Sequence, residues 1–484
     1  MSDAGSTRAP APRAVAEELP GWVDPLDALE AARGARNPVL LLSGLEGHPA
    51  SRFSILACDP VMTFEVRDDR AILRDAGGRE EERSVADPFD LLRSLAPTGA
   101  VAPIPPLPFA GGAVGCLGYG LRRAVERLPA RPPDPLGQPD AWFGLYDSGV
   151  VFDSRERRVS LVASGTGAAP AAGGEAQARR RIADLRTILA RAPATGGPRS
   201  LVGRRPPRRQ AVLVTPREEY LRRIRRALDY IAAGDIYQVN LSHRIECPFE
   251  AEPIDLFRRL AELNPAPFAA YVDAGSFKVI SASPERFVAL VGDRAWSSPI
   301  KGTRPRGATP ADDRRLARDL LESPKDRAEN VMIADLVRND LGRVSRPGSV
   351  RVASLCALES FATVHHLVST IEGRLEAGRG RIDLLRALFP GGSMTGAPKV
   401  RAMEVIDELE GEERGLYSGS VGYLSFDGTM DFNIVIRTLV LAGGRAHLRA
   451  GGAIVADSEP TQEFRETLDK ARALLQAMDA DLRS

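Results

Sequence analysis

Short apolar runs separated by turn residues dominate the first third of the chain, from residue 19 to about 165. Runs such as 38–44, 51–61 and 148–153 have the length and composition of β-strands, and they predict a sheet-rich region. From about residue 215 onward, segments with helical periodicity alternate with short strand-like runs. The predicted helices are 216–233, 324–339, 397–410 and 460–478, and the predicted strands are 236–246, 269–274, 277–282, 285–291, 361–374, 416–426, 430–441 and 445–450.

The predicted strands of the second half follow one another mainly as hairpins, which is typical of an α+β protein with antiparallel sheets. Two stretches rich in Ala, Gly and Pro interrupt the chain and flank a predicted amphipathic helix at 176–192. The sequence therefore predicts a disordered tail at 1–18, a sheet-rich region at 19–162, a linker with a helical excursion at 163–212, and a C-terminal domain at 213–484.

Charge and cysteine content argue against several classes of protein. The 65 basic and 64 acidic residues nearly cancel, and no basic stripe alternates with aromatic residues, so we expect no binding to nucleic acid. No apolar run approaches the roughly 20 residues that span a bilayer, and the N-terminus lacks the features of a signal peptide. The four cysteines are widely spaced, which suits a reducing compartment. We therefore expect a cytoplasmic protein that does not engage a membrane.

Lysine is scarce in this chain. Only five of the 65 basic residues are lysine, and the first 277 residues contain none. An amine can lose its proton when it is desolvated and then act as a nucleophile, whereas a guanidinium remains charged. A codon bias toward arginine explains any single surviving lysine equally well. Lys301, Lys399 and Lys470 nevertheless lie in segments that are dense in other chemically active residues.

Carboxylates gather on one face of two predicted helices. In the last helix, Glu463, Glu466 and Lys470 are spaced i, i+3 and i+7, so they share a face. Glu329 lies near the start of the helix that begins at about residue 324. Each observation also has a purely structural explanation. Glu466 and Lys470 could form a solvated ion pair on an exposed helix, and Glu329 could lie near a helix N-terminus because acids are favoured there. Two helices that present carboxylates to one pocket would instead suit Mg²⁺, which takes few protein oxygens.

Two further clusters combine polar side chains with bends of the backbone. Ser393 and Thr395 lie in a glycine-rich turn before a predicted helix, where N–H groups and hydroxyls could converge on an anion. Glu285 and Lys301 lie at the ends of predicted neighbouring strands, where a buried acid could protonate a leaving hydroxyl and a desolvated amine could attack carbon. His366 lies on one face of a predicted strand, a position compatible with either packing or catalysis.

Taken together, these clusters resemble the chorismate-binding enzymes over about residues 215–478, and the N-terminal half is similar more loosely. The segments that carry the resemblance occur in the order SPERF, PIKGTRPRG, KDRAENVMIADLVRNDLGR, VHHLVSTIEG, FPGGSMTGAPKVRAMEVIDELE, YSGSVGY, GGAIVADS and EFRETLDKA. The resemblance implies large, mostly antiparallel β-sheets packed as a sandwich with helices on the outside. It also makes residues 213–484 the catalytic, chorismate-binding domain.

The resemblance implies chorismate as the substrate and Mg²⁺ as the cofactor. Glu329 and Glu466 would hold Mg²⁺ against the ring carboxylate of chorismate, while Glu285 would protonate the departing 4-hydroxyl. Glu463 would face the nucleophile, and Tyr417 and Arg437 would bind the enolpyruvyl carboxylate, which suits the arginine fork. The other predicted site residues are His366 in the catalytic group and Gln238, Ser393, Thr395, Gly451 and Lys470 in the substrate pocket.

Two positions distinguish members of this family. Water-using members carry a lysine where this chain has Gln238, so the resemblance implies ammonia as the nucleophile. Anthranilate-forming members read PIAGT where this chain reads PIKGT, and in the members with lysine that amine attacks carbon 2 of chorismate. We therefore expect, from Lys301, formation of 4-amino-4-deoxychorismate on the route to 4-aminobenzoate and folate, with formation of anthranilate as the alternative.

The expected reaction needs a source of ammonia. The sequence has no G-x-C-x-G-x-Q nucleophile segment of a glutaminase. The resemblance therefore implies a heterodimer with a glutamine amidotransferase subunit, which would release ammonia from glutamine. Free ammonium would replace that subunit less efficiently.

Overall fold

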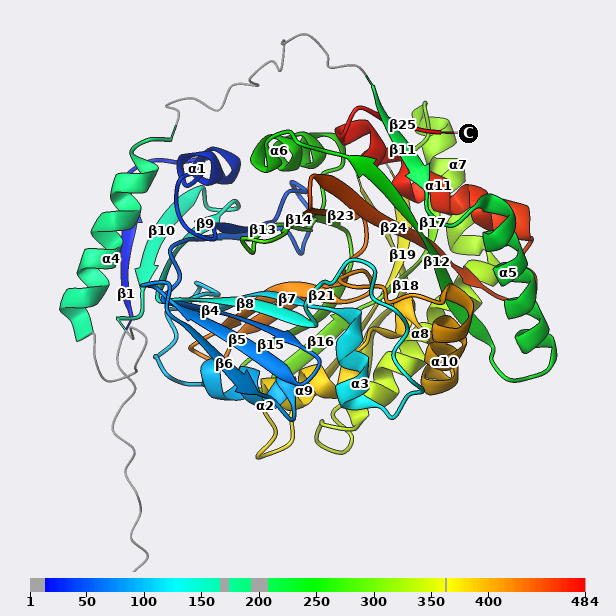
Figure 1. The fold of residues 1–484 in the computed structure, drawn as a ribbon, viewed down its shortest axis with the longest axis horizontal. Helices are drawn as coiled ribbons and strands as arrows, with labels where there is room; N and C mark the ends of the chain where they lie inside the picture. The colour runs from blue at the N-terminus through cyan, green and yellow to red at the C-terminus, as the bar shows by residue number, and fades with distance from the viewer. Residues whose placement is uncertain (1–13, 166–173, 193–207, 362–363, 484) are drawn as a thin grey trace, which may run out of the picture.

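Two large β-sheets face each other in the computed structural model, which describes residues 14–165, 174–192, 208–361 and 364–483 (Figure 1). Every named strand pair is antiparallel except β11–β25 among these residues. The first sheet has thirteen described strands in the order β1 (Val15–Leu19), β10 (Arg158–Ala163), β9 (Ser148–Asp153), β3 (Phe53–Ala57), β2 (Val39–Leu42), β13 (Phe268–Asp273), β14 (Lys278–Ser283), β23 (Thr438–Ala442), β24 (Arg445–Ile454), β12 (Gln238–Pro248), β11 (Arg209–Leu213) and β25 (Ala480–Leu482), with β20 (Gly396–Ala397) paired to β12.

The second sheet has twelve strands within the same residues. Its order is β17 (Ile300–Pro305), β19 (Val364–Arg374), β16 (Arg294–Ser298), β15 (Arg286–Val291), β22 (Met430–Asn433), β21 (Ser420–Ser425), β7 (Gly112–Leu117), β8 (Ala141–Tyr146), β4 (Met62–Arg67), β5 (Arg70–Asp75) and β6 (Glu80–Ser84), with β18 (Arg351–Ser360) paired to β19. The helices are α1 (Pro25–Ala31), α2 (Pro88–Leu95), α3 (Arg122–Val125), α4 (Gly174–Leu189), α5 (Arg217–Ala232), α6 (Pro253–Leu263), α7 (Pro310–Glu322), α8 (Pro324–Gly342), α9 (Arg381–Leu388), α10 (Lys399–Glu410) and α11 (Pro460–Ala477).

Both sheets contain strands from both halves of the chain. In the first sheet β2 pairs with β13, with Leu42 opposite Ala269. In the second sheet β7 pairs with β21, with Leu117 opposite Ser420. The N-terminal strands therefore extend the same two sheets that the C-terminal strands form, and the sandwich is continuous across the linker.

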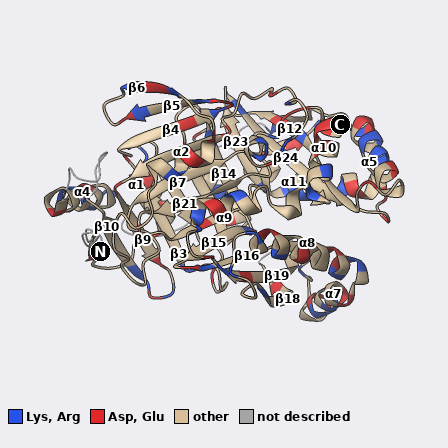
Figure 2. Ribbon diagram, turned by 90° about the horizontal axis from the view of Figure 1, so that it is seen from below, with Lys and Arg blue, Asp and Glu red and all other residues tan. Residues whose placement is uncertain are grey.

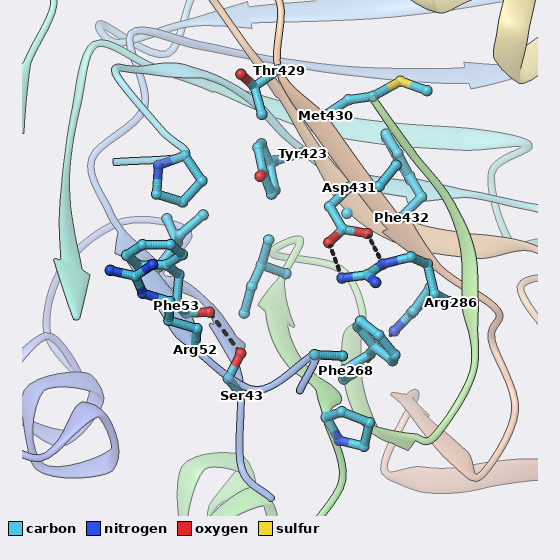
Figure 3. Close-up of a pocket in the computed structure, with 18 of the residues that line it drawn as sticks. Ser43, Arg52, Phe53, Phe268, Arg286, Tyr423, Thr429, Met430, Asp431 and Phe432 are labelled. Carbon is cyan, nitrogen blue, oxygen red and sulfur yellow. Dashed lines mark hydrogen bonds and ion pairs between the residues drawn. The ribbon is translucent and has the colours of Figure 1, made fainter. Parts of the chain in front are cut away.

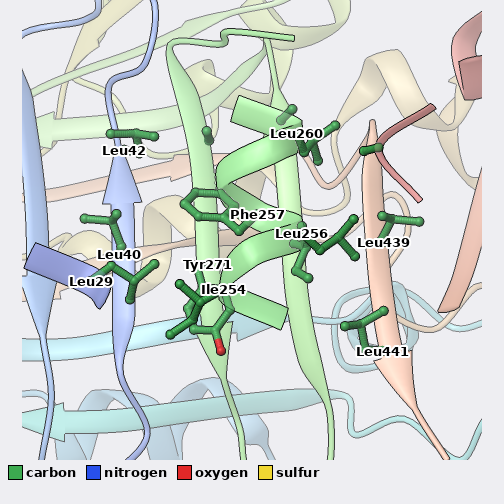
Figure 4. Packing of buried hydrophobic residues seen from close by; sticks show 14 of the residues in the cluster. Leu29, Leu40, Leu42, Ile254, Leu256, Phe257, Leu260, Tyr271, Leu439 and Leu441 are labelled. Carbon is green, nitrogen blue, oxygen red and sulfur yellow. The ribbon is translucent and has the colours of Figure 1, made fainter. Parts of the chain in front are cut away.

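Three layers of apolar side chains form most of the core, and a further cluster packs α5 and α10 against β12. Between the sheets, residues such as Val114, Val151 and Val279 pack together. On the outer face of the first sheet, α1, α4, α6 and α11 bury their apolar faces, as Figure 4 shows for Phe257 and Leu260 of α6 above the strands. On the outer face of the second sheet lie α2, α8 and α9. Charged side chains lie mainly on the outer helices and at strand ends (Figure 2).

The helices that flank the site begin with clear sequence signals. Ser323 caps α8 by accepting a hydrogen bond from the backbone N–H of Asp326, and proline occupies the first position of the helix. Glu459 caps α11 by accepting from two backbone N–H groups, again directly before a proline. These caps fix where each helix starts and therefore which of its residues face the sheets.

Several elements differ from the sequence predictions. Strand β1 includes residues 15–18 of the predicted tail, and β11 lies in the predicted linker; residues 1–13 lie outside the described residues. The predicted strand 430–441 is broken into β22 and β23, and Arg437 in the break has a positive φ of 51°. The elements that were not predicted include helices α6, α7 and α9 and strands β16 and β18 in the C-terminal half, and helices α1, α2 and α3 in the N-terminal region.

The predicted strand 361–374 begins at Val364 as β19, and residues 362–363 lie outside the described residues. Across the residues that the structure describes, none of the helices combines the length and the apolar character that crossing a membrane requires. The structure thus agrees with the sequence in containing long helices that are amphipathic rather than apolar throughout.

Candidate functional site

The predicted site residues come from both sheets, at the end of the sandwich where α8 and α11 lie (Figure 1). Strands β17 and β19 of the second sheet carry Lys301 and His366, and β24 of the first sheet carries Gly451. Helix α8 contributes Glu329, and α11 contributes the acids of the last helix. The site is therefore assembled from segments that are far apart in sequence, and the sandwich brings them together.

Lys301 lies partly buried at the centre of this group. Its Nζ lies 3.4 Å from the backbone oxygen of Ser393, to which it donates a hydrogen bond. Burial lowers the pKa of Lys301, and the charge of Lys470 lowers it further, whereas the nearby carboxylates Glu329, Glu285 and Glu466 oppose the shift. The net direction is toward the neutral amine, the form that can act as a nucleophile.

Glu285 lies at the turn between β14 and β15 and is almost fully buried, with 4% of its surface exposed. The hydroxyl of Ser393 donates a hydrogen bond to its Oε1 over 2.7 Å, and the backbone N–H of Ile300 approaches the same oxygen at 3.4 Å. Burial raises the pKa of Glu285 to about 7, although Ser393 and Lys301 partly offset the effect. A carboxyl with this pKa can hold a proton at neutral pH and donate it to a leaving group.

Three glutamates from two helices face this part of the protein. Burial raises the pKa of Glu329 on α8, and the charge of Glu463 on α11 acts in the same direction. Burial also raises the pKa of Glu463, whose Oε1 accepts a hydrogen bond from Ser458 over 2.6 Å. Glu466 differs, because Lys470 lies 2.6 Å away and lowers its pKa. The mutual effects of these charges show that α8 and α11 direct their acids to a shared region.

Gly451 lies beside Tyr417, and their packing leaves no space for a larger residue. A Cβ at Gly451 would lie 2.8 Å from the Tyr417 hydroxyl oxygen and 2.5 Å from a backbone oxygen, so any side chain would displace one of them. The charge of Tyr417 acts on Arg437, whose pKa is lowered by burial. Arg437 adopts the left-handed backbone region, which costs roughly 1 kcal/mol for a non-glycine residue. Such strain often occurs where a side chain must be aimed at a ligand.

His366 is buried and neutral. Burial lowers its pKa to about 4, and the charge of Arg437 adds to this effect. Its Nδ1 lies 2.9 Å from the hydroxyl of Thr303. The neighbouring His365 points away and contacts Asp313 of α7, as expected for successive residues of a strand.

Gln238 and Thr395, two predicted pocket residues, are both buried but differ in the hydrogen bonds of their side chains. Gln238 is fully buried, and neither atom of its side-chain amide has a hydrogen-bond partner among the described residues. Thr395 is also buried, but its hydroxyl lies 3.4 Å from the backbone oxygens of Gly391 and Gly392, within its own turn. Thr395 therefore supports the turn, and contact of its hydroxyl with the substrate stays a prediction.

Lys399 has a structural role in this fold, contrary to the expectation from its sequence neighbourhood. Its Nζ lies 2.5 Å from Asp340 of α8 and donates hydrogen bonds to the backbone oxygens of Leu388 and Pro390. The amine thus joins the turn before α10 to α8. These contacts account for the buried position of the Lys399 amine without a role in catalysis.

The sequence analysis missed two residues near the site. Arg414 is buried and donates hydrogen bonds to the backbone oxygens of Met394 and Asn240, over 2.9 and 2.6 Å, and to the Ser418 hydroxyl. It therefore links the Ser393 turn, β12 and the segment that follows Tyr417. Exposed Lys325 of α8 acts electrostatically on the site glutamates. Lysine scarcity could have revealed Lys325, whereas no local signal identified Arg414.

A cavity of about 520 Å³ lies away from these residues, between the two sheets. Figure 3 shows several of the side chains around it, including Phe53, Phe268 and Tyr423, with an ion pair between Arg286 and Asp431 at one side. Its lining is mainly apolar, and none of the predicted site residues contributes to it. The acid–base groups gathered around Lys301 therefore define the candidate active site, and this cavity does not.

The fold and this group of residues are those of an enzyme that acts on chorismate. The sequence pattern of the chorismate binding enzyme family matches residues 40–476, so the chain belongs to that family. The protein is a chorismate-utilising enzyme, and the resemblance inferred from the sequence is confirmed.

Curated relatives fall into two groups at similar identity. Aminodeoxychorismate synthase component 1 of Klebsiella aerogenes is 43% identical over 450 residues, covering 91% of this chain and 94% of that protein. Anthranilate synthase component 1 of Thermus thermophilus is 44% identical over 441 residues, covering 91% and 92%. The crystal structure of anthranilate synthase component I from Streptococcus pneumoniae has a TM-score of 0.77 and 33% identity, covering 89% of this chain and 93% of that chain. The predicted α+β sandwich is confirmed.

Proposed function

We propose that this chain is an aminodeoxychorismate synthase component 1, which converts chorismate and ammonia to 4-amino-4-deoxychorismate. The observation that supports this proposal most directly is the position of Lys301. Burial lowers the pKa of its amine, which donates a hydrogen bond to the backbone oxygen of Ser393. The Ser393 hydroxyl in turn donates a hydrogen bond to Glu285. A potential nucleophile and a potential general acid thus lie on either side of one residue.

In the first step, the neutral Lys301 amine attacks carbon 2 of chorismate, the two conjugated ring double bonds shift from C1=C2 and C5=C6 to C6=C1 and C4=C5, and the bond from carbon 4 to its hydroxyl breaks. Glu285 gives its proton to the departing oxygen, so that water leaves, and the new ammonium centre on Lys301 loses a proton. Burial favours this step because it raises the pKa of Glu285 and lowers the pKa of Lys301, and both shifts are toward the protonation states that the step needs.

In the second step, ammonia adds at carbon 4, both double bonds shift back, and the bond between carbon 2 and Lys301 breaks as the departing nitrogen takes up a proton. The amine is regenerated, and the amino group occupies the carbon that carried the hydroxyl. Glu463 is suited to accept a proton from the incoming ammonia, because burial raises its pKa. Tyr417 and Arg437 are suited to hold the enolpyruvyl carboxylate through a hydroxyl and a guanidinium.

The acids of α8 and α11 fit Mg²⁺. Glu329 of α8 and Glu466 of α11 offer hard carboxylate oxygens. This donor set matches Mg²⁺, which uses one or two carboxylates and completes its shell with water and substrate oxygens. When bound, Mg²⁺ would draw negative charge toward the ring carboxylate. Lys470 would then release Glu466 from their ion pair.

Removal of Mg²⁺ is expected to abolish turnover and to weaken chorismate binding. Chorismate would be titrated calorimetrically into the chelated protein with and without added Mg²⁺, for the native chain and for Glu329→Gln. We expect Mg²⁺ to tighten binding for the native chain by about tenfold or more, equivalent to roughly 1.4 kcal/mol, and to have little effect on the variant. Equal affinity with and without Mg²⁺ would contradict the assignment of Glu329.

Formation of anthranilate is the second candidate function, because anthranilate synthase components are as similar to this chain as aminodeoxychorismate synthase components are. The two activities differ in product. Anthranilate formation releases pyruvate and gives a fluorescent aromatic amine, whereas 4-amino-4-deoxychorismate keeps its enolpyruvyl group.

The covalent step can be tested directly by trapping. The native protein is incubated with chorismate and Mg²⁺ in the absence of ammonia, then digested and analysed by mass spectrometry. We expect added mass on the peptide that contains Lys301 and none on the peptide that contains Lys399, whose amine is held by Asp340. An unmodified Lys301 peptide from an enzyme that still makes the 4-amino product with ammonium would refute the covalent route.

A further inference from the structure

Arg414 is the centre of a buried polar network behind the site. It lies in the segment between α10 and β21, and only 2% of its surface is exposed. A guanidinium carries five N–H donors. The guanidinium of Arg414 makes five hydrogen bonds, two to Glu410 and one each to Met394, Asn240 and Ser418. Because these contacts engage all of its donors, the side chain is held in one orientation and keeps none of them for a substrate.

One of these contacts holds the turn that carries the partner of the candidate general acid. Arg414 donates a hydrogen bond over 2.9 Å to the backbone oxygen of Met394, which directly follows Ser393. The hydroxyl of Ser393 donates to Oε1 of Glu285 over 2.7 Å. Both Ser393 and Glu285 are buried. A displacement of the Met394 oxygen would therefore move the hydroxyl from which Glu285 accepts.

Two further contacts hold the segments that carry Tyr417 and Gln238. Arg414 donates over 3.0 Å to the hydroxyl of Ser418, which directly follows Tyr417, and its guanidinium carbon lies 5.7 Å from the centre of the Tyr417 ring. Ser418 has a positive φ of 67°, a conformation that surrounding contacts must maintain in a residue other than glycine. Arg414 also donates over 2.6 Å to the backbone oxygen of Asn240, two residues after Gln238 on β12. One guanidinium thus joins three segments of the site.

Glu410 compensates the charge of Arg414 inside the protein. It is the last residue of α10, is 2% exposed, and accepts from Arg414 over 2.6 and 3.0 Å. Its carboxylate also accepts from the backbone N–H of Ser242 over 2.7 Å and from Arg449 over 2.9 Å. Ser242 lies opposite Gly451 in the pairing of β12 with β24. A buried carboxylate without its partner is strongly destabilising, so this pairing keeps the Arg414 guanidinium in place.

We propose that Arg414 is a positioning residue for the reaction, which holds the Ser393 turn against Glu285 and the Tyr417 segment in a fixed relative position. The inference rests on the proposed function, through the role of Glu285 as the general acid. Since the donors of Arg414 are all engaged, it acts through Ser393 and Tyr417 and not on chorismate itself. A misplacement of about 1 Å that originates away from the reacting atoms can cost about 10²-fold in rate.

The pH dependence of the rate distinguishes positioning from a purely structural role. The rate should fall as the pH rises through the pKa of Glu285, because that acid acts when protonated. Burial raises the pKa of Glu285, whereas the hydrogen bond from Ser393 and the charge of Lys301 lower it. Loss of the hydrogen bond from Ser393 should therefore raise this pKa and move the alkaline fall to higher pH by roughly one unit.

The test compares Arg414→Lys, Ser393→Ala and the double variant with the native chain, by chorismate consumption across pH with ammonium as the nitrogen source. Lysine keeps the charge but offers three donors in place of five, so the contact with Met394 or Ser418 is lost. Arg414→Lys should lower kcat by about tenfold to 10²-fold and move the alkaline fall to higher pH, as Ser393→Ala does. The double variant should show the shift of Ser393→Ala alone, because both substitutions remove the same hydrogen bond.

Arg381→Lys is the matched control. Arg381 is also 2% exposed and donates hydrogen bonds to backbone oxygens, those of Ala96 and Ser425, which lie outside the site. This variant should lower the midpoint of thermal unfolding, as Arg414→Lys should. It should keep the native kcat and the native pH profile.

Four results would overturn the positioning role. They are a native kcat and pH profile in Arg414→Lys, an unmoved alkaline fall in Ser393→Ala, a shift in the double variant that adds to that of Ser393→Ala, and the same kinetic changes in Arg381→Lys. If Arg414→Lys has no cooperative thermal transition, Ser418→Ala decides. It removes one hydrogen bond beside Tyr417 and should weaken chorismate binding about fivefold with the alkaline fall unmoved, whereas native affinity would count against the proposal.

The proposed function fails in a different way. Chorismate consumption measures the effect of Arg414→Lys whichever amine is formed, so anthranilate as the product would refute the proposed function and leave the comparison of rates intact. A wrong assignment of Glu285 would appear in Glu285→Gln, which would then keep the native alkaline fall.

Discussion

Replacing Lys301 with alanine is expected to eliminate formation of 4-amino-4-deoxychorismate while the protein still folds and binds chorismate. The loss in kcat should reach at least about 10³-fold, since removal of a covalent nucleophile can cost about 10⁶. Any remaining turnover should give anthranilate, because ammonia would then attack the ring without a lysine adduct. Product chromatography with ammonium as the nitrogen source measures both effects.

Lys278→Ala is the matched control for this experiment. Lys278 lies at the start of β14, where its amine contacts Gly275 and Asp273 and not the site. This variant should retain native rates and the native product. A yield of the 4-amino product near the native level in Lys301→Ala would contradict the covalent role of Lys301. Loss of the cooperative thermal transition would instead indicate that the variant does not fold.

Replacing Glu285 with glutamine is expected to lower kcat by roughly 10²- to 10⁴-fold, the usual contribution of a general acid. Glutamine can retain the hydrogen bond from Ser393, but it has no acidic proton to give to the departing hydroxyl. The variant should therefore bind chorismate nearly as well as the native chain. Binding is measured by calorimetry and kcat by chorismate consumption.

The pH dependence of the native enzyme provides a further test of the same residue. Glu285 acts when protonated, and its pKa is about 7, so kcat should fall as the pH rises through 7. Lys301 acts when neutral, so the rate should fall on the acidic side, below the lowered pKa of that amine. Glu285→Gln should lose the alkaline fall, whereas Glu262→Gln, at an exposed position of α6, should keep the native profile. An alkaline fall that persists unchanged in Glu285→Gln would assign it to another group.

The sequence predicted the elements whose patterns are strong and local. Helices α5, α8, α10 and α11 were predicted to within a few residues, because caps, prolines and apolar periodicity agree at their ends. Helices α6 and α7 also begin with proline and carry amphipathic faces, so their signals were present but overlooked. The break between β22 and β23 could not be read from the pattern. It depends on the left-handed conformation of Arg437, which apolar alternation does not encode.

Some residues of the candidate site were predicted from the sequence, whereas others were not. Motif resemblance identified Lys301, Glu285 and Glu329, and the structure places their charges within range of one another. Lys399 was misjudged, because its partner Asp340 lies on another helix and only tertiary contact shows the pairing. Arg414 was missed for a similar reason, since it donates hydrogen bonds to backbone oxygens of two separate segments and to the Ser418 hydroxyl of a third. Residues that act through long-range packing leave little trace in local sequence.

The sharing of both sheets by the two halves has a consequence for how this protein folds and evolves. Pairing of β2 with β13 and of β7 with β21 requires contacts between residues that are very distant along the chain, and such topologies fold slowly. An isolated catalytic half would expose two long unpaired edges, which favour aggregation. Relatives that exchange their N-terminal halves would have to match hydrogen-bonding partners at both seams. Inheritance of the whole chain as one unit is therefore physically favoured over shuffling of its parts.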